Sequence, residues 1–232
     1  MTKTDSNPIL IAKKAAGQAA AEFIQEGMLV GLGTGSTAAF FIEALGKKCQ
    51  TGLKISAVAT SQQSAHQAQL LGIPIQDPET IASFDIMVDG ADEIDHQKNM
   101  IKGGGGALLR EKLLAQASKE VIIIVDETKL VDYLGNHPLP VEIVPFVYHT
   151  TIRRLEEQGY QGRLRLNRQS KPFMTDNGNY IFDIQYSHPI FDIEKEQAKL
   201  KSLTGVIETG LFFHLANRVI IGYEDGLTKV QA

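Results

Sequence analysis

The residues with the clearest chemical meaning lie in and around a run of four glycines, Lys102-Gly-Gly-Gly-Gly-Ala-Leu-Leu-Arg-Glu-Lys112. Each glycine is about 1 kcal/mol less favourable than alanine in a helix and has no side chain to pack, so the run suits neither a helix nor a strand interior. It is typical of a place where a ligand approaches the backbone. Lys102 enters the run, and Glu111 lies in the first turns of the helix expected after it. This arrangement suits an anionic or polyhydroxylated small molecule and one general base.

A cluster of carboxylates precedes the glycines, in Asp89-Gly-Ala-Asp-Glu-Ile-Asp95. Such a cluster raises the hypothesis of a metal site, but its spacing does not match an EF-hand loop and no histidine pair stands at ligand spacing. We therefore expect no metal and no cofactor. Asp89 and Asp92, nearest the end of an expected strand, are the candidate functional pair. Glu93 and Asp95 are expected to form an acidic surface loop.

A third segment, Gly31-Leu-Gly-Thr-Gly-Ser-Thr37, lies between an expected strand and an expected helix. Its glycines and hydroxyls can present N–H groups and side-chain donors to a phosphate at a helix N-terminus. It does not match a dinucleotide fingerprint, because Ser36 stands where the third glycine belongs and no acidic residue ends the next strand. On the residues alone, a tight strand-to-helix turn and a phosphate site stay equally open.

Two shorter segments complete the set. Thr60-Ser-Gln-Gln-Ser64 follows another expected strand, where Ser61 is expected to cap a helix. Lys129, in Asp126-Glu-Thr-Lys129, is either a further cation of the site or an ordinary surface lysine. Open parallel sheets place their chemistry at the carboxyl ends of the strands, so we expect the turn at 31–37, the segment at 60–64, the acidic cluster and the glycine run to converge on one edge.

Short apolar runs alternate with amphipathic stretches in the first half of the chain, which predicts right-handed βαβ units and a mostly parallel sheet, an α/β fold. The helix at 9–26 is expected to end at Gly27 as a C-cap. The expected strands are 28–32, 54–59, 84–88 and 121–125, and the expected helices are 9–26, 36–46, 62–71 and one beginning near Gly106.

The pattern changes beyond about residue 130, where strand, helix, strand, strand and helix are expected at 141–147, 150–158, 163–166, 180–185 and 193–203. Pro138 and Pro140 are expected to flank a turn, and Asp176-Asn-Gly178 is a strong hairpin signal. Two short strands in 206–221 can complete either sheet. We predict a Rossmann-like catalytic domain, 1–130 plus 206–232, and a smaller α+β domain, 131–205.

Composition excludes several classes of function. The 232 residues are 43% hydrophobic, which is ordinary for a globular protein. Their net charge of −4 shows no surplus of basic residues, so the composition gives no indication of nucleic-acid binding. No apolar run approaches the roughly 20 residues that span a bilayer, and the N-terminus lacks a signal-peptide apolar region. A single cysteine, Cys49, fits a reducing compartment, so a cytoplasmic location is expected.

Taken together, the motifs resemble the ribose-5-phosphate isomerase A family. The resemblance rests on GLGTGST, DGADEID, KGGGGALLREK, the lysine of DETK, LPVEIVPF and MTDNGN, in this order and spacing from about residue 10 onward. It implies a metal-free aldose-ketose isomerase of the non-oxidative pentose phosphate pathway, with a Rossmann-like domain and a smaller α+β domain, commonly assembled as a homodimer or homotetramer.

The same resemblance assigns roles to individual residues. It implies that Glu111 is the proton acceptor and that three segments and one lysine contact the substrate. Many family members have alanine where this chain has Gly106, which is expected to loosen the helix start. The implied substrate contacts are Thr34, Gly35, Ser36 and Thr37; Asp89, Gly90, Ala91 and Asp92; Lys102, Gly103, Gly104 and Gly105; and Lys129.

The chemistry of these residue types fits an isomerase. One carboxylate, Glu111, can remove the C2 proton and return it to C1 through a cis-enediolate. Lys102 and glycine N–H groups can stabilise the oxyanion, Asp89 is the candidate for opening the sugar ring, and Asp92 can hold hydroxyls or orient Lys102. Other classes left open are a sugar-phosphate deaminase or transferase on a similar scaffold, and a non-enzymatic sugar-phosphate sensor.

Overall fold

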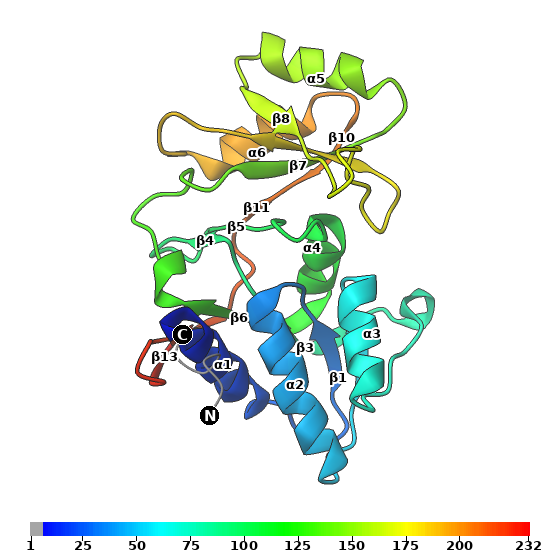
Figure 1. Ribbon diagram of the computed structural model, residues 1–232, viewed down its shortest axis with the longest axis vertical. Coiled ribbons are helices and arrows are strands. Elements are labelled where there is room, and N and C mark those ends of the chain that lie inside the picture. The colour runs from blue at the N-terminus through cyan, green and yellow to red at the C-terminus, as the bar shows by residue number, and fades with distance from the viewer. Residues whose placement is uncertain (1–6) are drawn as a thin grey trace. The chain divides into compact units, whose positions relative to one another are not determined.

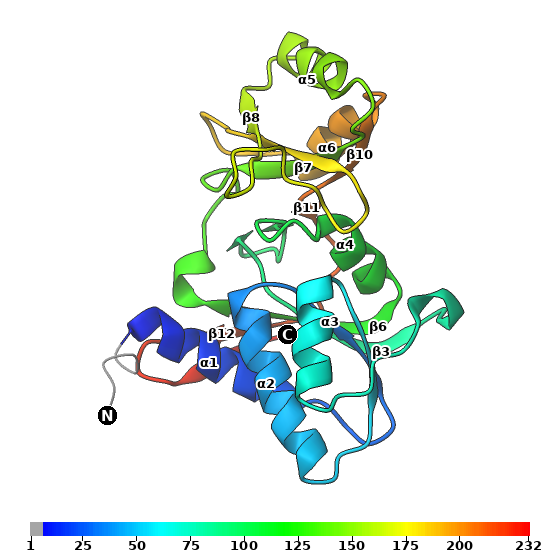
Figure 2. The same ribbon diagram turned by 45° about the vertical axis from the view of Figure 1, so that its right-hand side comes forward.

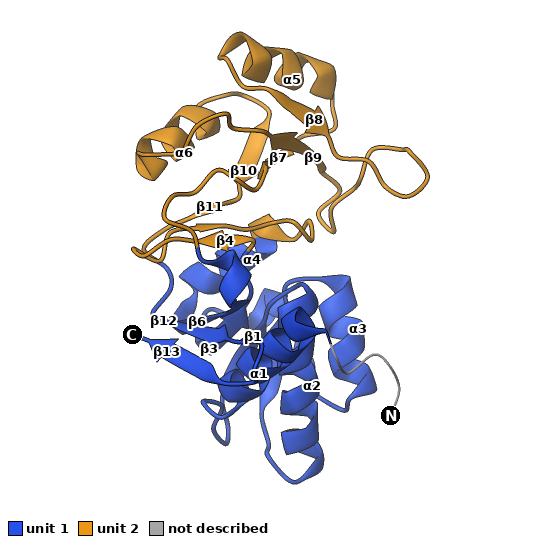
Figure 3. Ribbon diagram, turned by 60° about the vertical axis from the view of Figure 1, so that its left-hand side comes forward, with its two compact units in different colours: residues 1–91, 110–130, 215–232 blue, residues 92–109, 131–214 orange. Residues whose placement is uncertain are grey.

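The computed structural model describes residues 7–232, which form two compact units. Unit 1 comprises the described part of Met1–Ala91 together with Arg110–Leu130 and Leu215–Ala232, and unit 2 comprises Asp92–Leu109 and Val131–His214 (Figure 3). In the described part of the chain, no helix combines the length and the apolar character needed to cross a membrane.

Unit 1 is built on a six-stranded sheet of order β13-β12-β6-β3-β1-β2. Figure 1 labels β13, β6, β3 and β1 of this sheet. All neighbouring strands pair in parallel except β13, which runs antiparallel to β12 at the edge. The predicted α/β class with a mostly parallel sheet is confirmed. The strands are β1 Leu29–Leu32, β2 Ser56–Ala59, β3 Phe84–Asp89, β6 Ser118–Asp126, β12 Arg218–Gly222 and β13 Thr228–Gln231.

Helices cover this sheet because their small and apolar faces are buried against it. α1 packs against α2, β6 and β12, and α2 packs in turn against α3, so the three helices form one layer (Figure 2). Buried side chains of α1 and α2, among them Ala16, Ala20 and Phe41, share one core with alternate residues of the strands such as Ile86 and Ile122. The helices are α1 Pro8–Ala21, α2 Ser36–Gln50, α3 Gln62–Leu70 and the short 3₁₀ turns Pro78–Thr80 and Glu127–Lys129. A fourth helix, α4 Leu108–Gln116, begins in unit 2 and belongs to unit 1 from Arg110 onward.

Unit 2 contains two antiparallel sheets, of order β10-β7-β9-β8 and β11-β5-β4, and it therefore has the α+β character that was predicted. Its core includes buried side chains of β7, β9, α5 and α6. The elements are β4 Glu93–Ile94, β5 Met100–Ile101, β7 Leu139–Ile143, α5 Tyr148–Glu157, β8 Gly162–Leu164, β9 Tyr180–Ile184, α6 Ile193–Lys201, β10 Val206–Thr209 and β11 Leu211–Phe212.

Several element boundaries differ from the sequence-based expectation. α1 ends at Ala21 with Glu22 as its C-cap, so Gly27 is not a helix cap but lies in the turn before β1. Pro140 lies inside β7 rather than in a turn, and β7 ends at Ile143 because the chain turns before α5. The two-residue strands β4 and β5 were not predicted, since so short a segment carries no readable periodicity.

The last segment also divides differently. It holds three strands where two were expected: β10 joins the larger sheet of the second unit, β12 joins the parallel sheet, and β11 pairs with β5 in a third sheet that was not predicted. Relative to the predicted domains, the compact units place 92–109 and 206–214 with the second unit. The loops around Asp176-Asn-Gly178 connect β8 and β9, which pair antiparallel as the hairpin signal suggested.

Candidate active site

The turn between β1 and α2 is held by hydrogen bonds to the end of β3. Gly33 donates from its N–H to the Val88 carbonyl at 2.9 Å, and Thr34 donates from its N–H to Asp89 Oδ1 at 3.0 Å. A side chain on Gly33 would place its Cβ 2.1 Å from Asp89 Oδ1, so only glycine allows this approach. Gly35, with φ of +111°, is the N-cap of α2, and no side chain caps the helix there. The exposed backbone at Gly35 and Ser36 therefore offers helix N–H groups to an anion.

Hydroxyl groups of the segment after β2 form hydrogen bonds with this turn. Thr60 Oγ1 lies 2.7 Å from Thr34 Oγ1 and donates to the Leu32 carbonyl at 3.1 Å. Ser64 Oγ donates to the Gly33 carbonyl at 2.8 Å, and Ser61 accepts from the Ser64 N–H as the predicted helix cap. The segment at 60–64 thus holds the backbone of the turn, which sequence reasoning did not foresee.

Asp89 ends β3 and is fully buried. Its Oδ1 accepts from the N–H groups of Thr34 and Gly90, at 3.0 and 2.8 Å. The connection after β1 leads to β2 on one side of β1, and the connection after β2 crosses to β3 on the other side. The turn and Asp89 therefore flank the switch point where open α/β sheets bind ligands. The expected convergence is thereby seen for Thr34 and Asp89.

Lys13, near the turn, was missed by the sequence analysis, whereas Lys129 was predicted. Lys13 of α1 donates from Nζ to Ser36 Oγ at 2.9 Å and lies 4.0 Å from Asp126 Oδ2, at the end of β6. The sequence contained no signal for Lys13, which looks like any lysine on an amphipathic helix. Lys129 follows in the 3₁₀ turn after β6 and is half-buried.

Glu111 lies in the first turn of α4 and only 2% of its surface is exposed. A glutamate on a helix is ordinarily solvated, and this alternative is excluded here by the burial. Lys112, next to it, is also buried, at 5% exposure. A carboxylate kept out of water at the start of a helix is the type of group that serves as a general base.

The glycine run belongs to unit 2 and follows β5, a strand of the antiparallel β11-β5-β4 sheet. The expectation that it follows a strand of the parallel sheet was wrong, because the unpredicted strands β4 and β5 intervene. Within unit 2, Asp92 Oδ2 accepts from the Gly104 N–H at 2.8 Å. Lys102 is buried at 3% exposure, and its Nζ lies 5.3 Å from the centre of the Phe212 ring.

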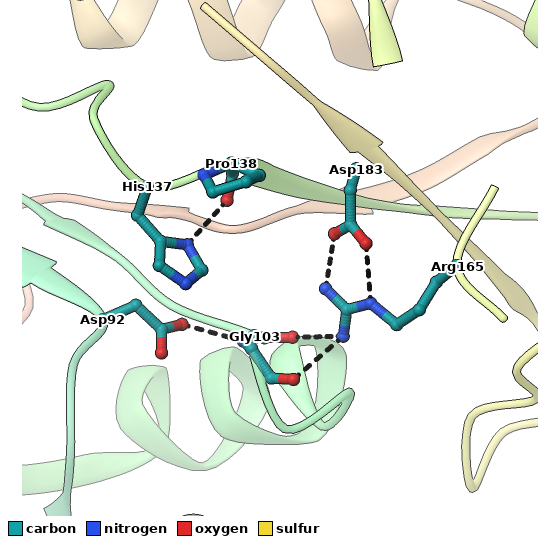
Figure 4. A network of polar contacts seen from close by, with 7 residues as sticks. Asp92, Gly103, His137, Pro138, Arg165 and Asp183 are labelled. Carbon is teal, nitrogen blue, oxygen red and sulfur yellow. Dashed lines mark hydrogen bonds and ion pairs between the residues drawn. The ribbon is translucent and has the colours of Figure 1, made fainter. Parts of the chain in front are cut away.

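Arg165, just after β8, is a second residue that was missed. Its Nη1 donates to the carbonyls of Gly103 and Gly104, at 2.9 and 3.1 Å, while its other nitrogens bond Asp183 (Figure 4). Gly106 has φ of +84°, and a methyl group there would lie 2.5 Å from the Phe173 ring. The glycine therefore fits a tight turn, and α4 begins two residues after it, at Leu108.

The acidic cluster is not a surface loop throughout. Glu93 is buried and accepts from the N–H groups of Gly135 and His137, at 2.9 and 2.6 Å, so its role is to hold the loop before β7. Asp95 is half-buried and closes a local turn by accepting from the N–H groups of Gln97 and Asn99. Among residues 7–232, no group of three or more His, Cys, Asp and Glu side chains is arranged to hold a metal ion.

The predicted residues thus fall into two sets. Unit 1 carries Thr34 to Thr37, Asp89 to Ala91, Glu111 and Lys129, and unit 2 carries Asp92 and Lys102 to Gly105. Hydrogen bonds join Thr34 to Asp89 in the first set and Asp92 to Gly104 in the second. The fold and these strand-end groups define a Rossmann-like α/β protein of the class that binds small anionic ligands.

Comparison with known proteins narrows this class. The sequence matches the model of ribose 5-phosphate isomerase A (phosphoriboisomerase A) over residues 56–226. Ribose-5-phosphate isomerase A of Protochlamydia amoebophila is 57% identical over 232 residues, which is 100% of both chains. The Bacillus mycoides protein of the same name is 46% identical over 217 residues, covering 94% of this chain and 98% of its own.

Solved structures of ribose 5-phosphate isomerases also resemble this chain in fold. Ribose 5-phosphate isomerase from Plasmodium falciparum superimposes with a TM-score of 0.90 at 38% identity, covering 97% of this chain and 98% of its own. A D-ribose-5-phosphate isomerase in complex with phospho-erythronic acid gives a TM-score of 0.89 at 39% identity, with coverages of 94% and 96%. The chain belongs to the ribose 5-phosphate isomerase A family.

Proposed function

We propose that this protein interconverts D-ribose 5-phosphate and D-ribulose 5-phosphate through a cis-enediolate, as a step of the non-oxidative pentose phosphate pathway. The observation that carries the proposal is the burial of Glu111, at 2% exposure, in the first turn of the helix that follows the glycine run. Family membership supplies the reaction, and the buried carboxylate supplies the group that the reaction requires.

Glu111 is the general base in this proposal. Its carboxylate removes the proton from C2 of the open aldose, the electrons of that C–H bond form the C1–C2 double bond, and the C1 carbonyl electrons move onto the C1 oxygen, which gives the enediolate. The hydroxyl proton on the C2 oxygen then passes to the C1 oxygen, the C2 oxygen becomes the carbonyl of the ketose, and Glu111 returns its proton to C1. One carboxylate is sufficient because both carbons present the proton on the same face, and a positioned base of this kind contributes about 10²- to 10⁴-fold to the rate.

We assign the substrate phosphate to the turn that opens α2. Thr34, Gly35, Ser36 and Thr37 offer hydroxyl and N–H donors, and the 15-residue helix behind them has no side-chain cap, so its N-terminal partial charge favours an anion. Lys13 supports the assignment because its ammonium group already contacts Ser36 Oγ, at 2.9 Å. Lys129 is proposed as a further cation that contacts the substrate.

The other predicted residues have roles in the sugar chemistry. Asp89, with Gly90 and Ala91, is proposed to bind the sugar and to help open its ring, and Asp92 to hold hydroxyl groups. Lys102 and the N–H groups of Gly103, Gly104 and Gly105 are proposed to stabilise the oxyanion, a contribution of about 3 kcal/mol for a well-placed donor. The buried state of Lys102 supports this, since a partly dehydrated cation interacts strongly with a developing negative charge.

A coupled assay that detects ribulose 5-phosphate formation, with and without a chelator, tests the proposed function. We expect turnover that survives exhaustive chelation, because the proposed chemistry uses only side chains and backbone groups. Activity lost on chelation and restored by a divalent ion would instead favour a metal at the acidic cluster. Tight binding of ribose 5-phosphate without isomerisation would indicate a sensor, and substrate profiling would reveal a deaminase or transferase.

Two further proposals concern the protein in its cell. We propose a cytoplasmic location, which the single cysteine supports, and assembly into a homodimer or homotetramer, as the resemblance to the family implies. Light scattering coupled to size-exclusion chromatography measures the assembly directly, and a mass of one chain would refute it.

A further inference from the structure

The peptide between Gly103 and Gly104 is held from both sides in unit 2. Its carbonyl accepts from Arg165 Nη1 at 2.9 Å, and its N–H donates to Asp92 Oδ2 at 2.8 Å (Figure 4). The Gly106 N–H also donates to this carbonyl, at 2.9 Å. The carbonyl and N–H of a trans peptide point in opposite directions, so a donor on one side and an acceptor on the other fix its orientation.

This restraint matters because glycine supplies none of its own. Glycine populates positive and negative φ about equally, and Gly103 itself has φ of +101°. A peptide between two glycines rotates more readily than any other, and rotation would turn its N–H away from Asp92. The run needs external bonds if its N–H groups are to be fixed before a negative charge develops on the substrate.

Arg165 provides hydrogen bonds from outside the glycine run. Asp183 of β9 accepts from Arg165 Nε at 2.8 Å and also bonds Nη2, so the carboxylate grips one edge of the guanidinium. The planar fork then directs Nη1 to the carbonyls of Gly103 and Gly104. Both side chains of the ion pair are mostly buried, at 15% and 23% exposure, which limits the screening of their charges by water.

We propose that Arg165, aligned by Asp183, is a positioning residue of the isomerase: it clamps the Gly103–Gly104 peptide so that the N–H groups of the glycine run and Asp92 keep the orientation that the transition state requires. The inference rests on the proposed function of the same glycine run. It goes further by assigning a role to two residues outside every motif that carries the family resemblance.

The proposal predicts a particular kinetic signature. Loss of the clamp lowers transition-state stabilisation and leaves phosphate binding intact, so kcat falls while KM changes little. For Arg165→Ala we expect a decrease in kcat of about a hundredfold, the scale for a misplaced group or a lost oxyanion donor. Arg165→Lys should retain an intermediate activity, because an ammonium cannot bond Asp183 and both carbonyls in one plane.

The experiment compares Arg165→Ala, Arg165→Lys and Asp183→Asn with the control Arg168→Ala, which removes an exposed arginine from the loop after β8. Added guanidinium ion, at concentrations that leave the wild type folded, should restore part of kcat to Arg165→Ala alone. Affinity for phospho-erythronic acid, whose carboxylate resembles the enediolate, should fall in parallel with kcat. Amide exchange at Gly104 should accelerate while exchange in the strands of β7 and β9 stays slow.

Unchanged kcat in a folded Arg165→Ala would overturn the inference, as would a loss of kcat in the folded variant that guanidinium does not restore. If Arg165→Ala does not fold, Arg165→Lys and Asp183→Asn decide the matter by the same comparison of kcat with KM. These results are distinct from failure of the proposed function, in which the wild-type protein itself does not isomerise ribose 5-phosphate.

Discussion

Replacement of Glu111 by glutamine tests the central assignment most directly. Glutamine has the shape of glutamate, so the buried site, at 2% exposure, keeps its packing and the variant should fold. It cannot accept a proton from carbon at neutral pH. The contribution of a positioned base is about 10²- to 10⁴-fold, which corresponds to roughly 3 to 5 kcal/mol of transition-state stabilisation. We expect kcat to fall by that factor while KM stays within a few-fold.

The assay is the coupled measurement of ribulose 5-phosphate, combined with solvent exchange of the C2 hydrogen in D₂O. The wild type should exchange this hydrogen, because the proton on Glu111 can equilibrate with water before it returns to carbon, whereas Glu111→Gln should not. Glu127→Gln, which changes an exposed glutamate in the 3₁₀ turn after β6, is the matched control and should behave as the wild type.

Two results would refute the reasoning. The first is a Glu111→Gln variant that folds and retains more than about a tenth of the wild-type kcat, which is far above what loss of a general base allows. The second is a variant with slow turnover but normal exchange at C2, which would show that another group removes the proton.

Three further predictions concern other parts of unit 1. Lys13→Met should raise KM for ribose 5-phosphate and the inhibition constant of inorganic phosphate about tenfold with little change in kcat, because it removes a cation whose bond to phosphate is worth about 1.5 kcal/mol or more. Lys14→Met, which changes an exposed neighbour, is the control, and equal constants for the two variants would contradict the assignment. Asp85 accepts from the Leu29 N–H and pairs with Lys119, and these two contacts lower the pKa of its carboxyl, so its stabilising effect is complete above the ordinary carboxyl pKa and is lost as pH falls through the lowered pKa. Asp85→Ala should reduce the free energy of unfolding in urea by about 1 kcal/mol at neutral pH, and by less at the most acidic pH the protein tolerates, without loss of activity. Burial raises the pKa of the Cys49 thiol, so its alkylation at neutral pH should be slower than that of a peptide thiol, and Cys49→Ser should keep full activity. Alkylation of Cys49 as fast as that of the peptide thiol would contradict this prediction.

The periodicity of the chain determined most of the fold. Runs such as 84–88 and 121–125 alternate with amphipathic stretches, and strands buried on both faces of a parallel sheet must be continuously apolar, so the α/β class could be predicted from composition and spacing. Two-residue strands such as β4 and β5 could not be predicted, because their pairing partners are distant in sequence and their length is too short to show a period.

The sequence by itself also indicated which residues could do chemistry, at Glu111, Asp89 and the glycine run, because a carboxylate next to glycines that cannot be explained by a helix or a strand indicates a ligand; their roles stay predictions. Only the tertiary structure decided that Lys13 reaches Ser36 and that Arg165 reaches Gly103. These two contacts join residues that are 23 and 62 positions apart in the chain, so they depend on how strands and helices pack. A lysine or arginine on a polar face looks the same in the sequence whether it lies in solvent or bonds a loop distant in the chain.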